Sequence, residues 1–226
     1  MTTMHDQTAL LRRPSRLGTE IYDVLLGQLM SLRIAPGARI TVDNLSRELG
    51  VSQTPIREAL GRLEVEGLVI KTHLVGYSAA PQLDRRQFEE MYELRLLLEP
   101  PAARRAAERM PDDALRDLGA LAGRMHAGGA EDTSLSYSQF ARLDAAFHDA
   151  IVAGGGNGLI RDTLARLHIH LRLFRLLYHA RVTAEAAEEH ARIVACLAAR
   201  DGDGAARALD HHITRSRSRF IRIFDR

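Results

Sequence analysis

One helical stretch of the chain carries a pair of residues with metal-ligand chemistry. In "LDAAFHDAI", Asp144 and His148 are four residues apart. A helix therefore places both on one face, beside the apolar stripe of Leu143, Phe147 and Ile151. A carboxylate and an imidazole are ligands that borderline divalent ions accept. An Asp-x-x-x-His pair by itself, however, is more typical of a surface hydrogen bond than of a metal site.

Two further histidines strengthen the metal interpretation. His190 in "EEHARIVACLAARD" and His212 in "ALDHHITRS" fall on the last two predicted helices, which can run antiparallel and face the helix of Asp144. One carboxylate and three imidazoles suit Zn, with Ni, Mn or Fe as alternatives, and leave positions open for water or an organic acid. The competing interpretation is a buried polar network without metal, which would need partners for three neutral histidines.

The other histidines of this region are expected to be structural or solvated. They are His168, His170 and His179, all in "LARLHIHLRLFRLLYHAR". His211 precedes His212 and lies about 100° away on the same helix, so only one of those two can point inward.

A second stretch, "GVSQTPIREALGRLEVEGLV", has the spacing of a turn followed by a nucleic-acid-reading helix. Gly50 ends the short helix predicted in "VDNLSRELG", for which Thr41 or Asp43 is the N-cap. Ser52 can cap the next helix, and Pro55 is tolerated in its first turn. The buried face of that helix is predicted to comprise Ile56, Leu60 and Leu63, with Val65 as a further candidate and the polar residues facing outward.

The elements around these stretches predict a mainly α protein with two domains. A first helix at about 18–33 precedes the turn, and the runs "GLVIKT" and "VGYSA" flank His73 and Leu74 as a β-hairpin. Together they predict an N-terminal winged helix-turn-helix with a small β-hairpin wing. An all-α antiparallel bundle follows, with helices expected at 84–108, 112–127, 136–153, 157–179, 183–200 and 203–223. The expected organisation is a flexible tail at 1–16, a DNA-binding domain at 17–80, a linker at 81–86 and a helical effector and metal-binding domain at 87–226.

Composition excludes several other classes of protein. The chain has 226 residues, and its 31 basic and 29 acidic residues give a charge of +2, which does not by itself indicate a nucleic-acid partner. Cys196 is the only cysteine, which excludes an intrachain disulfide and a Cys-based zinc motif. We expect Cys196 to be a small core residue. No secretory signal or membrane span of roughly 20 apolar residues is recognisable, so a soluble cytoplasmic protein is expected.

The stretch "VSQTPIREALGRLEVEGLV" resembles the recognition helix of GntR-type bacterial transcription regulators. Six long helices after it are similar to the FadR-like subgroup, which carries an FCD ligand-binding domain. The resemblance covers the chain from about Ile21 to Arg219.

The resemblance implies a set of DNA-binding residues. The positions that follow the turn are Ser52, Gln53, Thr54 and Arg57, and their chemistry agrees, because Arg pairs with guanine and Gln with adenine. Arg62, further along the helix, is an additional candidate. Many relatives have Arg at the position of Gln53, so the preferred base may differ. At the wing the expected contacts are Gly76 and His73; Val75 stands where many relatives have a basic residue.

In the C-terminal domain the resemblance implies that the metal ligands are Asp144, His148, His190 and His212, with His212 favoured over His211. It also implies a cavity position for Arg95, which would bind a carboxylate effector. Arg172 and Asn157, predicted on one helix, are further effector-binding candidates.

The resulting hypothesis is a ligand-responsive transcriptional regulator, a repressor that is not an enzyme. It would bind a palindromic double-stranded DNA operator as a homodimer and respond to a small carboxylate, without contact to a membrane. The alternative is a metal-dependent hydrolase that uses the Asp/His cluster to activate water. No HExxH or similar pattern supports the hydrolase, and a helical interaction protein would leave the recognition helix unexplained.

Overall fold

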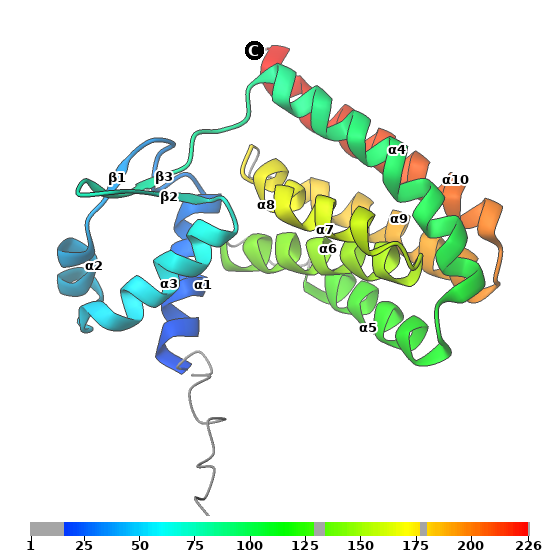
Figure 1. Cartoon of the computed structure of the whole chain (residues 1–226), viewed down its shortest axis with the longest axis horizontal. Coiled ribbons are helices and arrows are strands. Elements are labelled where there is room, and N and C mark those ends of the chain that lie inside the picture. Colours follow the sequence, from blue (N-terminus) through cyan, green and yellow to red (C-terminus); the bar gives the residue numbers. More distant parts are fainter. Residues whose placement is uncertain (1–15, 129–133, 177–179, 226) are drawn as a thin grey trace, which may run out of the picture.

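The computed structural model describes residues 16–128, 134–176 and 180–225. Most of this part is helical, as predicted, and a small antiparallel sheet lies in the N-terminal domain (Figure 1). The tail predicted at 1–16 falls almost entirely outside the described residues.

The N-terminal domain is a three-helix unit whose apolar faces meet in one core. Its helices are α1 (Arg16–Met30), α2 (Val42–Leu49) and α3 (Gln53–Val65). Gly50 ends α2 in the left-handed conformation, with φ of 65°, which a residue without Cβ adopts at no steric cost. Ser52 occupies the N-cap position of α3 with extended backbone but makes no side-chain capping bond. The predicted turn between the two helices is confirmed.

The predicted hairpin forms, and a third strand joins it. β2 (Val69–Thr72) pairs antiparallel with β3 (Gly76–Ala79), and β1 (Arg39–Ile40) pairs with the other edge of β3, giving the order β1-β3-β2. The prediction missed β1 because two residues are too few to show an alternating pattern. The strand brings the chain segment after α1 next to the wing.

Within the described residues after Pro81, the C-terminal domain has seven α-helices rather than six. They are α4 (Arg85–Arg109), α5 (Asp112–Gly128), α6 (Ser134–Gly154), α7 (Gly158–Leu167), α8 (Ile169–Phe174), α9 (Ala180–Ala198) and α10 (Gly202–Phe220), followed by the 3-10 turn η2 (Ile221–Asp225). The single helix predicted at 157–179 is wrong. His168 adopts φ of 44° and ends α7, so the chain changes direction before α8.

The C-terminal helices surround α6. α4 and α10 run side by side along one edge, while α7 and α8 cover one side of α6 (Figure 1). α4 begins at Arg85, inside the predicted linker, where Asp84 and Gln87 form a capping box. Among the described helices, none has both the length and the apolarity needed to cross a bilayer.

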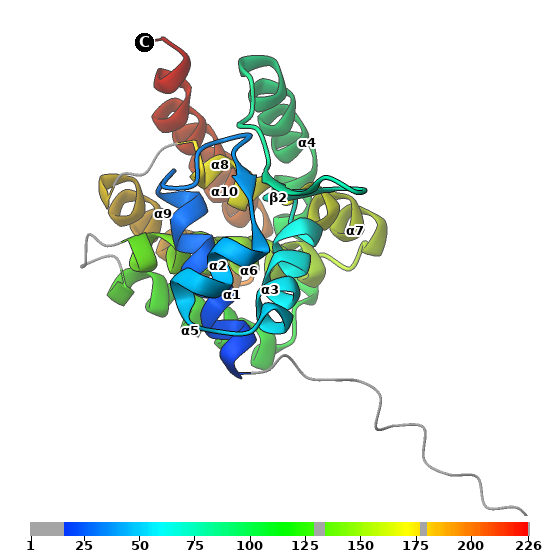
Figure 2. The ribbon, with the colours of Figure 1, turned by 90° about the vertical axis from the view of Figure 1, so that its left-hand side faces the viewer.

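The two domains touch through α1 and α6. Arg142 of α6 forms an ion pair of 2.7 Å with Asp23 of α1, and its guanidinium lies 5.3 Å from the ring centroid of Tyr22. α2 and the N-terminal end of α3 lie on the side turned away from the C-terminal helices (Figure 2). The end of α3 that carries the predicted base-reading residues is therefore free of the other domain.

Candidate metal centre and nucleic-acid interface

The four predicted metal ligands converge inside the C-terminal domain. α6 supplies Asp144 and His148, α9 supplies His190 and α10 supplies His212. All four side chains are buried, and one ligand atom from each lies within 4.8 Å of the others. His211 is exposed, so His212 is the member of that pair that points inward. Three helices thus place one carboxylate and three imidazoles around a common point.

Two buried glutamates fix the orientation of two of these rings. His148 Nδ1 lies 2.6 Å from Glu99 Oε2, and His212 Nδ1 lies 2.7 Å from Glu189 Oε2. Burial would raise the pKa of Glu189, but hydrogen bonds from Arg219 and His212 lower it to about 2. Burial likewise opposes ionisation of Glu99, yet the charge of Arg95 holds its pKa well below the ordinary value. Both carboxylates are therefore charged and accept the Nδ1 protons.

That tautomer leaves the Nε2 lone pairs of His148 and His212 facing each other at 3.3 Å. Burial lowers the pKa of His148 well below its ordinary value and that of His212 to about 4, so neither ring is protonated at neutral pH. Two facing lone pairs repel each other unless a cation or a proton lies between them. A divalent ion would remove this conflict.

His190 gives independent evidence for a divalent ion at this site. It is fully buried, and within the part of the chain that the structure describes neither ring nitrogen makes a hydrogen bond with acceptable geometry. Its Nε2 lies 3.2 Å from Asp144 Oδ1, a distance that suits an ion pair but lacks hydrogen-bond alignment. A buried polar group without a partner costs roughly 1–3 kcal/mol. The donor set therefore fits a divalent metal better than it fits a closed polar network.

The prediction missed His170, which was expected to be structural or solvated. Its Nδ1 lies 2.7 Å from Asp144 Oδ2, and its ring lies 4.3 Å from that of His148. Burial would raise the pKa of Asp144, but the hydrogen bond from His170 and the nearby ring of His190 hold it well below the ordinary value, so His170 donates to a carboxylate. The break at His168 rotates the following residues toward the cluster. A continuous helix over 157–179 gives no signal for this orientation.

Arg95 reaches the cluster with its charge already paired. Its side chain is 2% exposed, and its Nε donates to Glu99 Oε1 at 2.7 Å, while Nη2 lies 3.4 Å from His148 Nδ1. It borders a cavity of about 10 Å³ beside Asp144 and His212, which has room for about one water molecule. The charge of Arg95 is therefore already neutralised by Glu99 and is not available in full to a carboxylate ligand.

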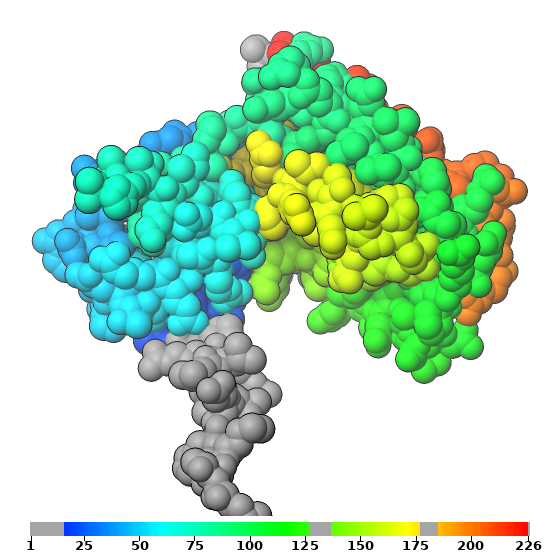
Figure 3. Space-filling view, viewed as in Figure 1, coloured from blue at the N-terminus to red at the C-terminus, as the bar shows by residue number. Residues whose placement is uncertain are grey.

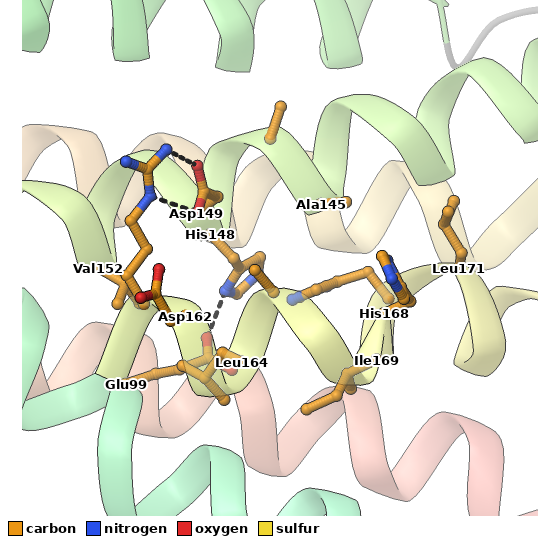
Figure 4. A pocket seen from close by; sticks show the side chains of 14 residues that line it. Glu99, Ala145, His148, Asp149, Val152, Asp162, Leu164, His168, Ile169 and Leu171 are labelled. Atoms are coloured by element: carbon orange, nitrogen blue, oxygen red, sulfur yellow. Dashed lines mark hydrogen bonds and ion pairs between the residues drawn. The ribbon is translucent and has the colours of Figure 1, made fainter. Parts of the chain in front are cut away.

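A much larger cavity opens on the other side of His148. Its volume is about 510 Å³, and its mostly apolar wall comes from α6, α7 and the start of α8 (Figure 4). Glu99, His148 and His170 form the part of the wall nearest the cluster. Asp149 and Arg161 pair with each other across its rim at 2.7 Å and 2.9 Å. A cavity of this size accommodates an ordinary metabolite.

The structure does not bring Asn157 and Arg172 to this site. Neither occurs among the described residues that line the two cavities next to the cluster. Asn157 caps α7, accepting hydrogen bonds from the amides of Leu159 and Ile160, and borders an open depression with Arg105. The single helix on which they were predicted ends at His168, and effector binding by Asn157 and Arg172 stays a prediction.

The residues predicted to contact bases lie at the exposed N-terminal end of α3. Ser52, Gln53, Thr54 and Arg57 are all exposed. Gln53 Nε2 donates to Asp43 Oδ1 at 2.6 Å, and Arg57 Nη2 donates to Gln53 Oε1 at 3.2 Å. This chain of hydrogen bonds orients Arg57 and Gln53 before DNA arrives.

Arg62 does not belong to this exposed set. Its guanidinium lies 3.9 Å from the ring centroid of Tyr22, and its Nη1 is buried. Tyr22 also donates to Glu66 Oε2 at 2.6 Å. Arg62 stacks within its own domain because the helix turns it toward α1. DNA contact by Arg62 stays a prediction.

At the wing, His73 and Gly76 are exposed as the prediction requires, and the apolar Leu74 between them is 94% exposed. The missing basic residue is supplied from another strand. Arg39 of β1 donates through Nη2 to the backbone carbonyl of Val75 at 3.2 Å. Sequence reasoning missed Arg39 because β1 was not predicted.

The fold and these two sites define a class of protein: a winged-helix transcription regulator with a helical ligand-binding domain. Residues 17–77 match the family described as bacterial regulatory proteins, gntR family, and residues 90–215 match the FCD domain. The chain therefore belongs to the GntR family of bacterial transcription regulators and carries an FCD domain.

Named relatives agree with this assignment. The chain is 30% identical over 195 residues to the Nta operon transcriptional regulator of Aminobacter aminovorans, which spans 86% of this chain and 90% of that protein. It is 25% identical over 197 residues to the HTH-type transcriptional repressor RspR of Escherichia coli, spanning 86% and 84%. The solved structure of E. coli McbR/YncC matches with a TM-score of 0.66 at 22% identity, covering 92% of this chain and 98% of that chain, which shows a shared fold.

This membership settles the class of function. The chain is a DNA-binding transcription regulator of the GntR/FCD type, and the proteins it resembles are regulators rather than enzymes. The hydrolase alternative has no support from them.

Proposed function

We propose that this protein is a homodimeric, metal-containing repressor whose DNA binding responds to a small organic acid. The observation that carries the proposal is the pair of facing Nε2 atoms of His148 and His212, 3.3 Å apart with both Nδ1 protons held by glutamates. Asp144, His148, His190 and His212 would hold the ion, and Zn suits one carboxylate with three imidazoles. Ni, Mn or Fe would suit the same donors.

The effector would enter the cavity of about 510 Å³ and approach the ion past His148 and His170. Because Glu99 neutralises Arg95, the ion itself would supply most of the positive charge that attracts a carboxylate. Ala145, Val152 and Leu164 line the cavity and would contact the apolar part of the acid. The chemistry supplied by the bound ion is the polarisation and orientation of its oxygen ligands.

DNA recognition is assigned to the N-terminal end of α3 and to the wing. Arg57 and Gln53 would contact base edges in the major groove, with Ser52 and Thr54 on base edges or phosphates. Arg39 and His73 would reach the backbone or the minor groove at the wing, where Gly76 permits close approach.

Dimerisation is assigned to an exposed apolar stripe on α4. Leu94, Leu97, Leu98 and Pro101 recur at helical spacing, and Leu97 is 63% exposed. A two-fold dimer through this stripe would present two copies of α3 to a palindromic operator. A repressor role is supported by the name of the RspR relative and would act by occupying that operator.

Two measurements on the purified full chain test this proposal. Elemental analysis should find one divalent ion per chain in the wild type and a loss of metal in His212→Ala, whereas His211→Ala keeps it. In vitro selection from random DNA should return a palindrome bound by two chains. Equal metal content in the two histidine variants, or a selected site without two-fold symmetry, would contradict the respective part of the proposal.

A further inference from the structure

Three consecutive residues, His168, Ile169 and His170, touch the DNA-binding domain, the large cavity and the metal cluster. We infer that this segment transmits occupancy of the metal and effector site to the C-terminal end of the recognition helix α3. The inference rests on the proposed metal site and names the residues through which that site would act.

The contact with the DNA-binding domain is made by His168. Burial lowers the pKa of His168, whereas the interaction of its ring with the backbone of Val65, the last residue of α3, raises it. His168 has φ of 44°, a left-handed conformation that is uncommon for residues with a Cβ. The surface of α7 and α8 meets that of the N-terminal domain (Figure 3). Movement of His168 would therefore act on α3 directly.

All three residues also line the cavity of about 510 Å³, and His168 and Ile169 are seen at its wall (Figure 4). Ile169 is 2% exposed and packs into the core. A ligand that fills the cavity must contact the same segment that holds α3. His168 lines this cavity and also interacts with the backbone of Val65.

On the metal side the contact is made by His170. It donates to Asp144 Oδ2 at 2.7 Å, and its ring lies tilted against that of His148 with 4.3 Å between ring centroids, so it touches two of the four proposed ligands. A divalent ion held by Asp144 and His148 would withdraw charge from the acceptor of this hydrogen bond and would fix the rings of His148 and His170. The position of His170 would then depend on whether the site is filled.

The far end of α8 is also tied to the N-terminal part of the chain. Arg175, the C-cap of α8, is 3% exposed and donates through Nη1 to the carbonyl of Ala80 at 2.6 Å. Gln82 donates in return to the carbonyl of Arg175 at 3.0 Å. α8 is thus anchored to α3 at one end and to the segment after β3 at the other. A displacement of α8 cannot stay within the C-terminal domain.

Hydrogen–deuterium exchange of the full chain, with and without stoichiometric Zn²⁺ and no other ligand, tests the inference. In the wild type, Zn²⁺ should slow exchange in residues 167–174 and also in residues 61–70 at the end of α3. In His168→Gly the response of 61–70 should be lost while that of 167–174 remains, because Gly keeps the left-handed conformation but lacks the ring. Leu32→Gly, at another left-handed residue with φ of 58°, is the matched control and should respond as the wild type does.

His170→Phe provides a second route that keeps an aromatic ring beside His148 and removes the bond to Asp144; it should also lose the response of 61–70. A wild-type response confined to the C-terminal domain, or one that survives in both variants, overturns the inference and leaves the metal site intact. Failure of Zn²⁺ to bind or to change exchange anywhere overturns the proposed metal site and this inference with it.

Discussion

Glu189→Gln should weaken metal binding although none of the four proposed metal ligands is substituted. Glu189 Oε2 accepts the Nδ1 proton of His212 at 2.7 Å, which directs Nε2 at the cluster. The substituted amide is neutral, so it would hold the ring less firmly and lower the basicity of Nε2. Loss of such an outer partner typically reduces metal affinity about 10- to 100-fold, equivalent to about 1.4–2.7 kcal/mol. The site offers little compensation from water, because the Glu189 side chain is only 8% exposed.

The matched control is Glu188→Gln, the same change on the exposed neighbouring residue. Both variants and the wild type would be titrated with Zn²⁺ against a chromophoric chelator at pH 7, with circular dichroism to check that each is folded. The pair with Arg219, at 2.7 Å and 2.9 Å, is also weakened in Glu189→Gln, so thermal stability of the metal-free proteins should be measured alongside. Equal dissociation constants for the two variants would refute the role assigned to Glu189.

Three further predictions concern DNA binding, assembly and pH. Arg57→Ala should weaken binding to the selected operator by about 1–3 kcal/mol at fixed salt, measured by fluorescence anisotropy; an unchanged affinity would remove Arg57 from the base-reading set. Leu97→Glu should shift the dimer to a monomer in sedimentation velocity, because a charge would be buried in the apolar stripe of α4, and a dimer of unchanged stability would place the interface elsewhere. Burial raises the pKa of Glu66 in the folded state above its value in the unfolded chain. The stability that Glu66 contributes is therefore present below about pH 4.5 and is lost as the pH rises through its folded-state pKa. Glu66→Gln should therefore increase the free energy of unfolding at pH 7 and change it little at pH 4, as measured by urea denaturation.

The sequence by itself determined most of the helices, the exposed face of α3 and the pairing of Asp144 with His148 on one helix. Gly50 after "VDNLSREL" requires a left-handed turn, and "SQTP" opens a helix, so the relation of α2 to α3 follows from local chemistry. The heptad-like spacing of apolar residues likewise predicts most C-terminal helices. Asp144 and His148 share a face of α6 because four residues complete about one helical turn.

Only the tertiary structure decided which side chains that are far apart in the sequence come into contact. The break at His168 has no local signal, since "ARLHIHLRL" contains neither Gly nor Pro. Contacts with Val65 on one side and Asp144 on the other accompany the left-handed backbone there. That break accompanies the contact of His170 with Asp144.

The same holds for the charged residues. Arg62 and Arg57 are both arginines on one helix, yet the first stacks on Tyr22 and the second remains exposed. Arg95 is neutralised by Glu99, which in turn fixes the ring of His148. Local propensity sets where a helix begins and which face is apolar, but the partner of a buried charge depends on which other helix lies opposite. That is set by the packing of the whole domain, because a charge left buried without a partner would cost more free energy than a single local preference supplies.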